Sequence, residues 1–176
     1  MIKKLGSELT SDEVSQINEA SLRDFKTQFK IEDAKGKLYF LLIEGEKLIA
    51  FGALGEVKSV VFNGENFSIY GVYNVISNAK GKGFGKQVVV EITDYLSSNN
   101  LTGLGFCMPH NAGFYKNCGF NIEADSTQRF VYTKDGKSIT NLDGQVIFYQ
   151  DGSDKFMEKV LKNPQEEVSL PTDNLW

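Results

Sequence analysis

Ala79-Lys80-Gly81-Lys82-Gly83-Phe84-Gly85-Lys86 lies between an apolar run that predicts a strand and a run that predicts a helix. Successive glycines allow the backbone to turn tightly and to direct several N–H groups toward one point. The positive end of the following helix and the charges of Lys80, Lys82 and Lys86 favour an anion at that point. The segment therefore predicts a phosphate or diphosphate site, and the alternative is a solvated surface turn.

Two other phosphate-binding motifs do not fit this segment. A P-loop requires Ser or Thr after its Gly-Lys pair and a wider glycine spacing, whereas Gln87 follows Lys86 here. The dinucleotide fingerprint requires the spacing G-x-G-x-x-G, whereas Gly81, Gly83 and Gly85 are spaced G-x-G-x-G. The segment also follows two hairpins instead of opening a strand–helix–strand unit.

Two β-hairpins are predicted before the glycine segment. Their apolar strands are 38–43 with 48–54, and 57–62 with 67–76. A polar turn at Gly45 joins the first pair, and Asn63-Gly64, a strong hairpin signal, joins the second. The last strand is long and contains Gly71, which predicts a bulge or a close approach by another backbone.

Helices and strands alternate after the glycine segment. Val88, Ile92, Tyr95 and Leu96 follow one helical face. Further segments are a strand over 101–108, a short helix from Asn111 to Gly119, strands over 128–133 and 145–149, and an early helix capped by Thr10 or Ser11. This order predicts an α/β (α+β) fold in which helices flank one mixed, mostly antiparallel sheet.

Length and composition restrict the classes of protein. The 176 residues suit one domain, so a single domain over 1–176 is predicted. A net charge of −4 offers no basic excess for nucleic acid. No apolar run approaches the ~20 residues that cross a bilayer, and the polar start is unlike a signal peptide, so a cytoplasmic protein without membrane contact is expected. Cys107, Cys118 and the single His predict reduced thiols and no metal site.

Lys80-x-x-Gly83-x-Gly85 resembles the [Arg/Gln]-x-x-Gly-x-[Gly/Ala] signature of the GNAT superfamily of N-acetyltransferases. Lys80 departs from the usual Arg or Gln but supplies a positive charge, as Arg does. The resemblance implies splayed strands that form a cleft for acetyl-CoA, with Tyr73 and Val75 offering main-chain bonds to the pantetheine arm. It assigns the pyrophosphate to the residues Lys80, Gly81, Lys82, Gly83, Phe84, Gly85 and Lys86.

A second motif, Phe114-Tyr115-x-x-x-Gly119-Phe120, resembles the sequence that ends the family's cofactor site. The resemblance adds Asn111 to the cofactor-binding residues and makes Tyr115 the acid that protonates the leaving thiolate. A phenol near pKa ~10 and a thiol near ~8.5 make that transfer feasible. The alternative for Tyr115 is an ordinary helix aromatic that packs on Phe120.

The group that removes the proton from the amine is not identified. Many members of the family use a Glu on the bulged strand, and Gly71 stands at the matching position. No carboxylate lies between Glu65 and Glu91. A carboxylate from elsewhere, a chain of water molecules with backbone carbonyls, and the chain's C-terminus are the alternatives.

The rest of the chain resembles the aminoglycoside 2'-N-acetyltransferase branch. The matching segments are Arg23-Asp24-Phe25, Phe62-Asn63-Gly64, 141–146 and the terminal Trp176. The resemblance implies that Asp24 and the terminal carboxylate at Trp176 bind a cationic acceptor, since carboxylates pair with ammonium groups. The alternatives are a helix-end charge for Asp24 and a docked aromatic ring for Trp176.

Together these resemblances imply an acetyl-CoA-dependent N-acyltransferase of the EC 2.3.1 class that acetylates a primary amine of a small, aminoglycoside-like molecule. Two alternatives stay open. One is transfer to a protein N-terminus or lysine, and the other is a non-catalytic CoA-binding sensor that kept the glycine loop and lost the base. The sequence does not fix the oligomeric state, and a homodimer is among the alternatives.

Overall fold

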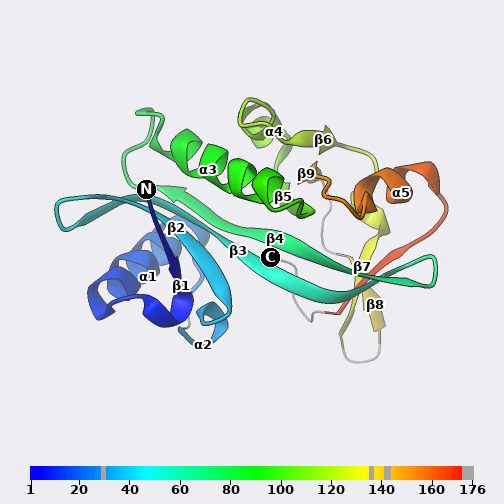
Figure 1. Ribbon diagram of the computed structural model, residues 1–176, viewed down its shortest axis with the longest axis horizontal. Helices are drawn as coiled ribbons and strands as arrows, with labels where there is room; N and C mark the ends of the chain where they lie inside the picture. The colour runs from blue at the N-terminus through cyan, green and yellow to red at the C-terminus, as the bar shows by residue number, and fades with distance from the viewer. Residues whose placement is uncertain (29–30, 135–136, 141–143, 172–176) are drawn as a thin grey trace. The chain divides into compact units, whose positions relative to one another are not determined.

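Two long strands, β3 (Lys47–Phe62) and β4 (Glu65–Ser77), and helix α3 (Phe84–Ser98) run through the molecule (Figure 1). The computed structural model describes residues 1–28, 31–134, 137–140 and 144–171. The first unit comprises Met1–Gly55 and Val72–Ile92, and the second comprises Glu56–Gly71 and Thr93–Trp176. Each of the three elements contributes a part to both units, and the single domain over 1–176 stays a prediction.

The first unit begins with β1 (Ile2–Leu5), η1 (Gly6–Glu8), α1 (Ser11–Phe25), α2 (Ile31–Ala34) and β2 (Lys37–Glu44). Strand β2 pairs antiparallel with both β1 and β3. The predicted cap of α1 is confirmed: the Thr10 hydroxyl accepts a bond from the Glu13 N–H at 3.2 Å. The Glu13 carboxylate accepts the Thr10 N–H at 2.8 Å, so a reciprocal capping box fixes the start of the helix.

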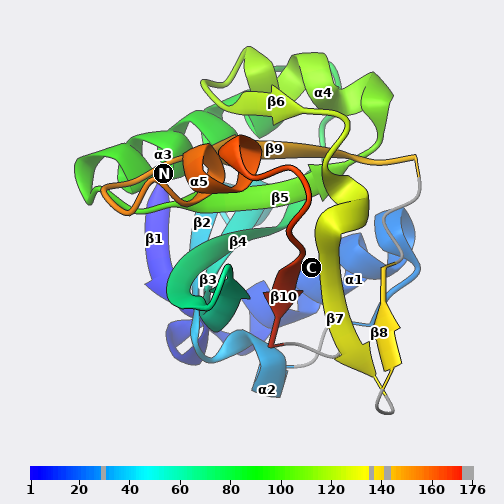
Figure 2. The same cartoon turned by 90° about the vertical axis from the view of Figure 1, so that its right-hand side faces the viewer.

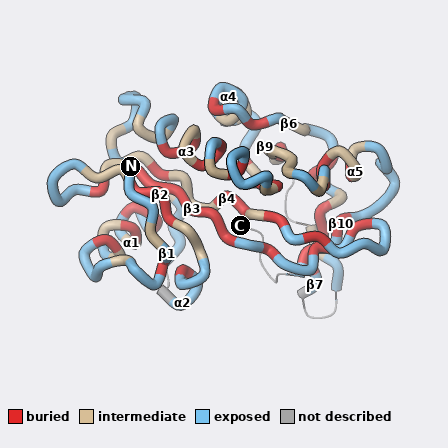
Figure 3. Tube along the Cα trace, in the orientation of Figure 1, coloured by how far each residue is buried: buried red, intermediate tan, exposed pale blue. Residues whose placement is uncertain are grey.

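Helices cover both faces of the sheet in the first unit. One core cluster joins α1, α2 and the strands through Ile17, Ala20, Ala34, Tyr39, Leu41, Leu48, Phe51, Ala53 and Ile76. Because side chains alternate along β3, Gly52 faces the other side. A Cβ there would lie 3.1 Å from Ile92 Cδ1 and 3.2 Å from Val88 Cγ1, so α3 packs directly on the strand. The buried stretches of β2 and β3 appear red in Figure 3.

The second unit is built from many short elements, among which α4 lies beside β6 (Figure 2). They are β5 (Gly103–Cys107), α4 (Pro109–Lys116), β6 (Asn121–Glu123), η2 (Thr127–Arg129), β7 (Phe130–Lys134), β8 (Lys137–Ile139), β9 (Val146–Gln150), α5 (Phe156–Lys162) and β10 (Val168–Leu170). The strand order is β6-β9-β5-β4-β3-β10-β7-β8. The pairings β4–β5 and β10–β7 are parallel, whereas β5–β9, β6–β9, β3–β10 and β7–β8 are antiparallel.

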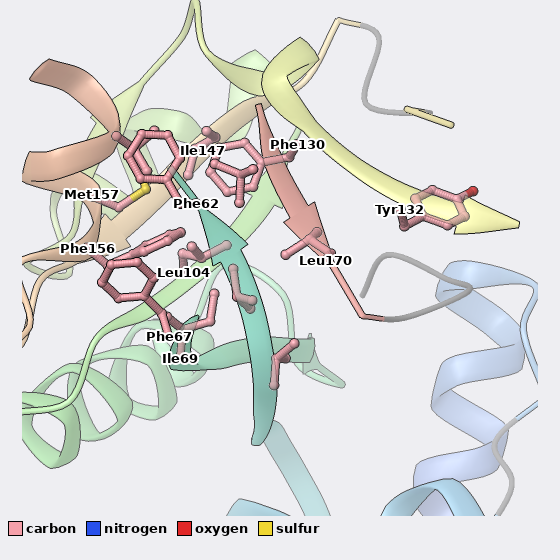
Figure 4. Packing of buried hydrophobic residues seen from close by; sticks show 14 residues of the cluster. Phe62, Phe67, Ile69, Leu104, Phe130, Tyr132, Ile147, Phe156, Met157 and Leu170 are labelled. Atoms are coloured by element: carbon pink, nitrogen blue, oxygen red, sulfur yellow. The ribbon is translucent and has the colours of Figure 1, made fainter. Parts of the chain in front are cut away.

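Helix α5, which the sequence did not predict, supplies the centre of the second unit's core. The Phe156 ring lies 5.0 Å from that of Phe67 and 6.4 Å from that of Phe62 (Figure 4). Asp151 accepts the N–H groups of the first turn, and the Arg129 guanidinium donates to Val160 O at 3.0 Å near the other end. These distant side chains satisfy the ends of a seven-residue helix.

Two local predictions differ from the structure. Segments 48–54 and 57–62 form one strand, because the polar residues between and within them face solvent while Val57, Val60 and Phe62 stay buried. The short helix α4 begins at Pro109 and not after a cap at Asn111. Proline suits a first helical position, where its missing N–H costs nothing.

Among the helices of the described residues, none is long and apolar enough to span a bilayer. The described part of the chain also holds no cluster of three His, Cys, Asp or Glu side chains arranged to bind a metal ion. Both cysteines are buried, and neither forms a disulfide bond in the described part of the chain.

We expect Gly6→Ala to lower the free energy of unfolding by about 1–3 kcal/mol, because the added methyl group would meet a backbone that has little room to move. Its Cβ would lie 1.9 Å from the Ala34 carbonyl oxygen. Gly36→Ala is the matched control, since nothing lies within 4 Å of its Cβ. Urea unfolding of both variants measures the difference, and equal midpoints would show that this close approach is not a constraint.

Candidate functional site

The end of β4 departs from a regular strand at Asn74, which has φ +48°. Asn tolerates this left-handed conformation better than most residues with a side chain. A bulge or a close approach by another backbone was predicted at Gly71; Gly71 pairs in register with Leu104 of β5, so the irregular residue is not Gly71. The irregular residue therefore lies between Tyr73 and Val75, the two residues whose main chain was expected to contact the cofactor.

The side chain of Tyr73 already has a partner. The Lys37 Nζ lies 3.9 Å from the centroid of its ring, and Gly55 stands between the two residues in the sheet. A Cβ at Gly55 would lie 2.8 Å from Tyr73 Cε2, so only glycine leaves this path open. Burial raises the pKa of Tyr73 to about 12 and lowers that of Lys37, against an opposing effect of Asp33. The Tyr73 ring therefore serves to hold Lys37.

In the glycine loop the sign of φ alternates from residue to residue, as it does in an anion-binding nest. Gly81 and Gly83 have φ +77° and +78°, whereas Lys82 and Phe84 have negative φ. Alternating left- and right-handed residues make neighbouring N–H groups converge. Nothing lies within 4 Å of a Cβ placed on either glycine, so no other part of the described chain crowds these two positions.

Helix α3 adds its first-turn amides to this loop. It begins at Phe84, and the Gln87 N–H donates to Gly83 O at 3.2 Å. The N–H groups before Gln87 have no acceptor within the helix, as at every helix start. The side chains of Lys82 and Lys86 are exposed beside them. This arrangement can bind a diphosphate by backbone donors and fixed positive charge.

Lys80 and Asp24 form a pair. The Lys80 Nζ lies 3.7 Å from Asp24 Oδ2, and the Arg23 guanidinium binds the same carboxylate at 2.8 and 3.1 Å. The hydrogen bonds from Arg23 and, to a smaller extent, the charge of Lys80 hold the pKa of Asp24 below its usual range, although burial opposes them. The Asp24 carboxylate is thus engaged by two cations of its own chain.

Tyr115 lies on α4 in the second unit. Its ring stacks on that of Phe148 with centroids 3.7 Å apart and planes 6° from parallel. Phe148 stands directly opposite Gly105 in the β5–β9 pair, and a Cβ on Gly105 would lie 2.3 Å from the end of the Phe148 ring. The missing side chain at Gly105 therefore makes room for the ring on which Tyr115 rests.

The phenol of Tyr115 is a neutral proton donor. Burial raises its pKa well above the ordinary value of about 10, and the neighbouring Cys107 and Cys118 add to the shift. Burial also raises the pKa of Cys107 to about 11, so this thiol stays protonated near neutral pH. The raised pKa keeps this half-buried phenol protonated at neutral pH, so a proton is available to a developing thiolate, but it also makes the phenol a weaker acid than an ordinary tyrosine.

The remaining predicted site residues are placed as follows. Asn111 is exposed on the first turn of α4, where its N–H donates to Met108 O at 2.8 Å. Trp176 lies outside the described residues. The structure brings Tyr73, Val75, Asp24 and the glycine loop into the first unit, and Asn111 and Tyr115 into the second. Sequence patterns gave no sign of Lys37 or Phe148. Lys37 meets Tyr73 in the space beside Gly55, and Phe148 lies over Gly105, and in both cases the glycine is on another strand.

Residues 3–120 match the acetyltransferase (GNAT) family. This segment covers more than half of the chain, so the chain belongs to that family, and the prediction of an N-acyltransferase that uses acetyl-CoA is confirmed at the level of the family. No curated protein matches the sequence. The aminoglycoside 2'-N-acetyltransferase branch is not confirmed by these comparisons.

Solved structures share the fold. YhbS, a GNAT family N-acetyltransferase from Escherichia coli solved with CoA, has a TM-score of 0.61 at 17% identity, over 99% of this chain and 93% of that one. Escherichia coli ElaA gives 0.60 at 12%, over 85% and 98%. A Bacillus subtilis acetyltransferase solved with CoA gives 0.55 at 20%, over 85% and 97%. The predicted mixed, mostly antiparallel sheet flanked by helices is thus confirmed.

Because burial raises the pKa of Tyr115, its ionisation should not limit activity at any pH below about 10. The measurement is the difference in phenolate absorbance between the wild-type protein and Tyr115→Phe during alkaline titration. The step that the substitution removes should lie above pH ~10. If the step that Tyr115→Phe removes lies instead at or below the ordinary pKa of tyrosine, the phenol is not desolvated.

Proposed function

We propose that this protein transfers the acetyl group of acetyl-CoA to a primary amine of a small molecule. The observation that carries the proposal is the glycine loop, in which Gly81 and Gly83 have positive φ immediately before the first-turn N–H groups of α3. A diphosphate supplies the acceptor oxygens and negative charge that such a loop favours. In a member of the GNAT family, the diphosphate of CoA is the ligand that fits.

The proposed chemistry requires two proton transfers. The neutral amine attacks the thioester carbonyl carbon, a C–N bond forms, and the C–S bond then breaks. The leaving CoA thiolate takes the proton of Tyr115, which solvent replaces after the product leaves. The amine also loses one proton. Gly71 stands where many family members have a Glu, and glycine has no side chain to accept this proton. A group from another position must therefore accept it.

For the acceptor we propose a cationic, aminoglycoside-like amine, with Asp24 and Trp176 as the predicted contacts. The net charge of −4 suits a cation. The pairing of Asp24 with Arg23 and Lys80 limits how much Asp24 contributes to binding the acceptor, because a carboxylate that already has two cationic partners gains less from a third. The main-chain roles of Tyr73 and Val75, the role of Asn111 and the cytoplasmic location stay predictions.

A CoA-binding sensor is the second candidate, and the absence of a carboxylate at Gly71 favours it. A sensor and an enzyme both bind CoA, but only an enzyme releases free thiol when acetyl-CoA and amines are supplied. Thiol release over a panel that includes aminoglycosides, simple diamines and a peptide with a free N-terminus and lysine separates these functions and also tests the protein-acceptor alternative.

We expect Tyr115→Phe to lower kcat by about tenfold or more while the CoA dissociation constant stays within about twofold, because the phenol acts only as the thiolate leaves. Thiol release and calorimetry with CoA give the two values. Tyr149→Phe is the matched control, since it removes the hydroxyl of a half-buried tyrosine next to Phe148. Unchanged turnover in Tyr115→Phe would refute the acid role, and no binding of CoA by the wild-type protein would refute the function itself.

A further inference from the structure

The C-terminal end of α1 is tied to the start of the glycine loop by a network of side chains. The Arg23 guanidinium donates to both Asp24 oxygens at 2.8 and 3.1 Å, and its Nη2 also donates to Asn78 Oδ1 at 2.9 Å. Arg23 and Asn78 are separated by 55 residues in the sequence. A planar guanidinium can hold both partners in one fixed geometry, which a lysine cannot do.

Asn78 is the first residue after β4, and its main-chain N–H and both ends of its side-chain amide have partners. Its N–H donates to Ile49 O at 2.8 Å, and its Nδ2 donates to Leu48 O at 2.6 Å. The bond from Arg23 uses the remaining amide oxygen. Asn78 is thus fixed to the start of β3 and to α1 at once, and the loop leaves the sheet from an anchored position.

The same network sets the charge next to the loop. Asp24 has a negative carboxylate that lies 3.7 Å from the Nζ of Lys80, inside the predicted phosphate-binding segment. A bare carboxylate there would repel a diphosphate and would compete with it for Lys80. The bidentate bond from Arg23 neutralises this carboxylate, and only 18% of the Asp24 side chain is exposed to solvent, which limits screening.

We propose that Arg23 is a positioning residue for cofactor binding: it anchors the glycine loop through Asn78 and neutralises Asp24, leaving Lys80 free to turn toward the diphosphate. This inference rests on the proposed use of CoA. It gives Asp24 a role inside the protein, as the alternative to the contact with the acceptor proposed above. Lys80 can change partner because its side chain is 78% exposed and Asp24 keeps Arg23.

The test compares Arg23→Gln, Asp24→Asn and the double variant by calorimetry with CoA. Arg23→Gln should weaken CoA binding about three- to tenfold, because it leaves the Asp24 charge beside the loop. The double variant should regain the part of this loss that comes from the unpaired carboxylate, and it should keep the part that comes from the lost bond to Asn78. The loss in Arg23→Gln should shrink as salt is added. Lys3→Gln is the control, because it removes a charge from the exposed Lys3–Glu91 pair of the same unit.

The outcomes separate this inference from the function on which it rests. If the wild-type protein does not bind CoA, the function fails. If it binds and Arg23→Gln binds equally well, or if Asp24→Asn does not rescue Arg23→Gln, the positioning role fails alone. A rise in the KM of the amine with unchanged CoA affinity in Asp24→Asn would return Asp24 to the acceptor site. A matched thermal midpoint in Arg23→Gln and Lys3→Gln separates a loss of affinity from a loss of folding.

Discussion

Buried backbone N–H groups need hydrogen-bond acceptors. The loop between β4 and α3 carries several N–H groups that lie outside the regular hydrogen bonding of a strand or a helix. Positive φ at Gly81 and Gly83 alternates with negative φ at Lys82 and Phe84, a pattern that directs neighbouring amides toward one centre instead of along a ladder. A side chain at either glycine would be strained in this conformation. Such a loop is stable only when the elements on both sides hold it, and when a ligand or water occupies its concave side.

The elements on both sides provide that support. On one side, the first unit fixes Asn78 to β3 and to α1. On the other, α3 packs on β3 over Gly52, whose missing side chain lets the helix approach. In the second unit Tyr115 is held in the same way, by a ring that lies over Gly105. Glycines in strands thus serve both units as places where another group can approach the sheet closely.

Local signals in the sequence predicted the parts of the fold that local chemistry decides. The capping box at Thr10, the Asn63-Gly64 turn and the glycine loop all depend on residues within a few positions of each other. The contact of Arg129 with the end of α5 and the contact of Arg23 with Asn78 depend on partners that only the folded chain brings together, so no short window of sequence contains them. Gly71 was a reasonable place for an irregular strand, but the register with β5 holds it in regular geometry.

The most direct measurement is the amide spectrum of the ¹⁵N-labelled protein during titration with CoA. The N–H resonances of Gly81, Gly83 and Gly85 should shift further than those of Gly45 and Gly64, which occupy left-handed turns far from the loop in sequence. Hydrogen bonds from these amides to phosphate oxygens are the cause of the expected shift. Binding of CoA that leaves the three loop resonances unmoved would contradict the assignment of the diphosphate to this backbone.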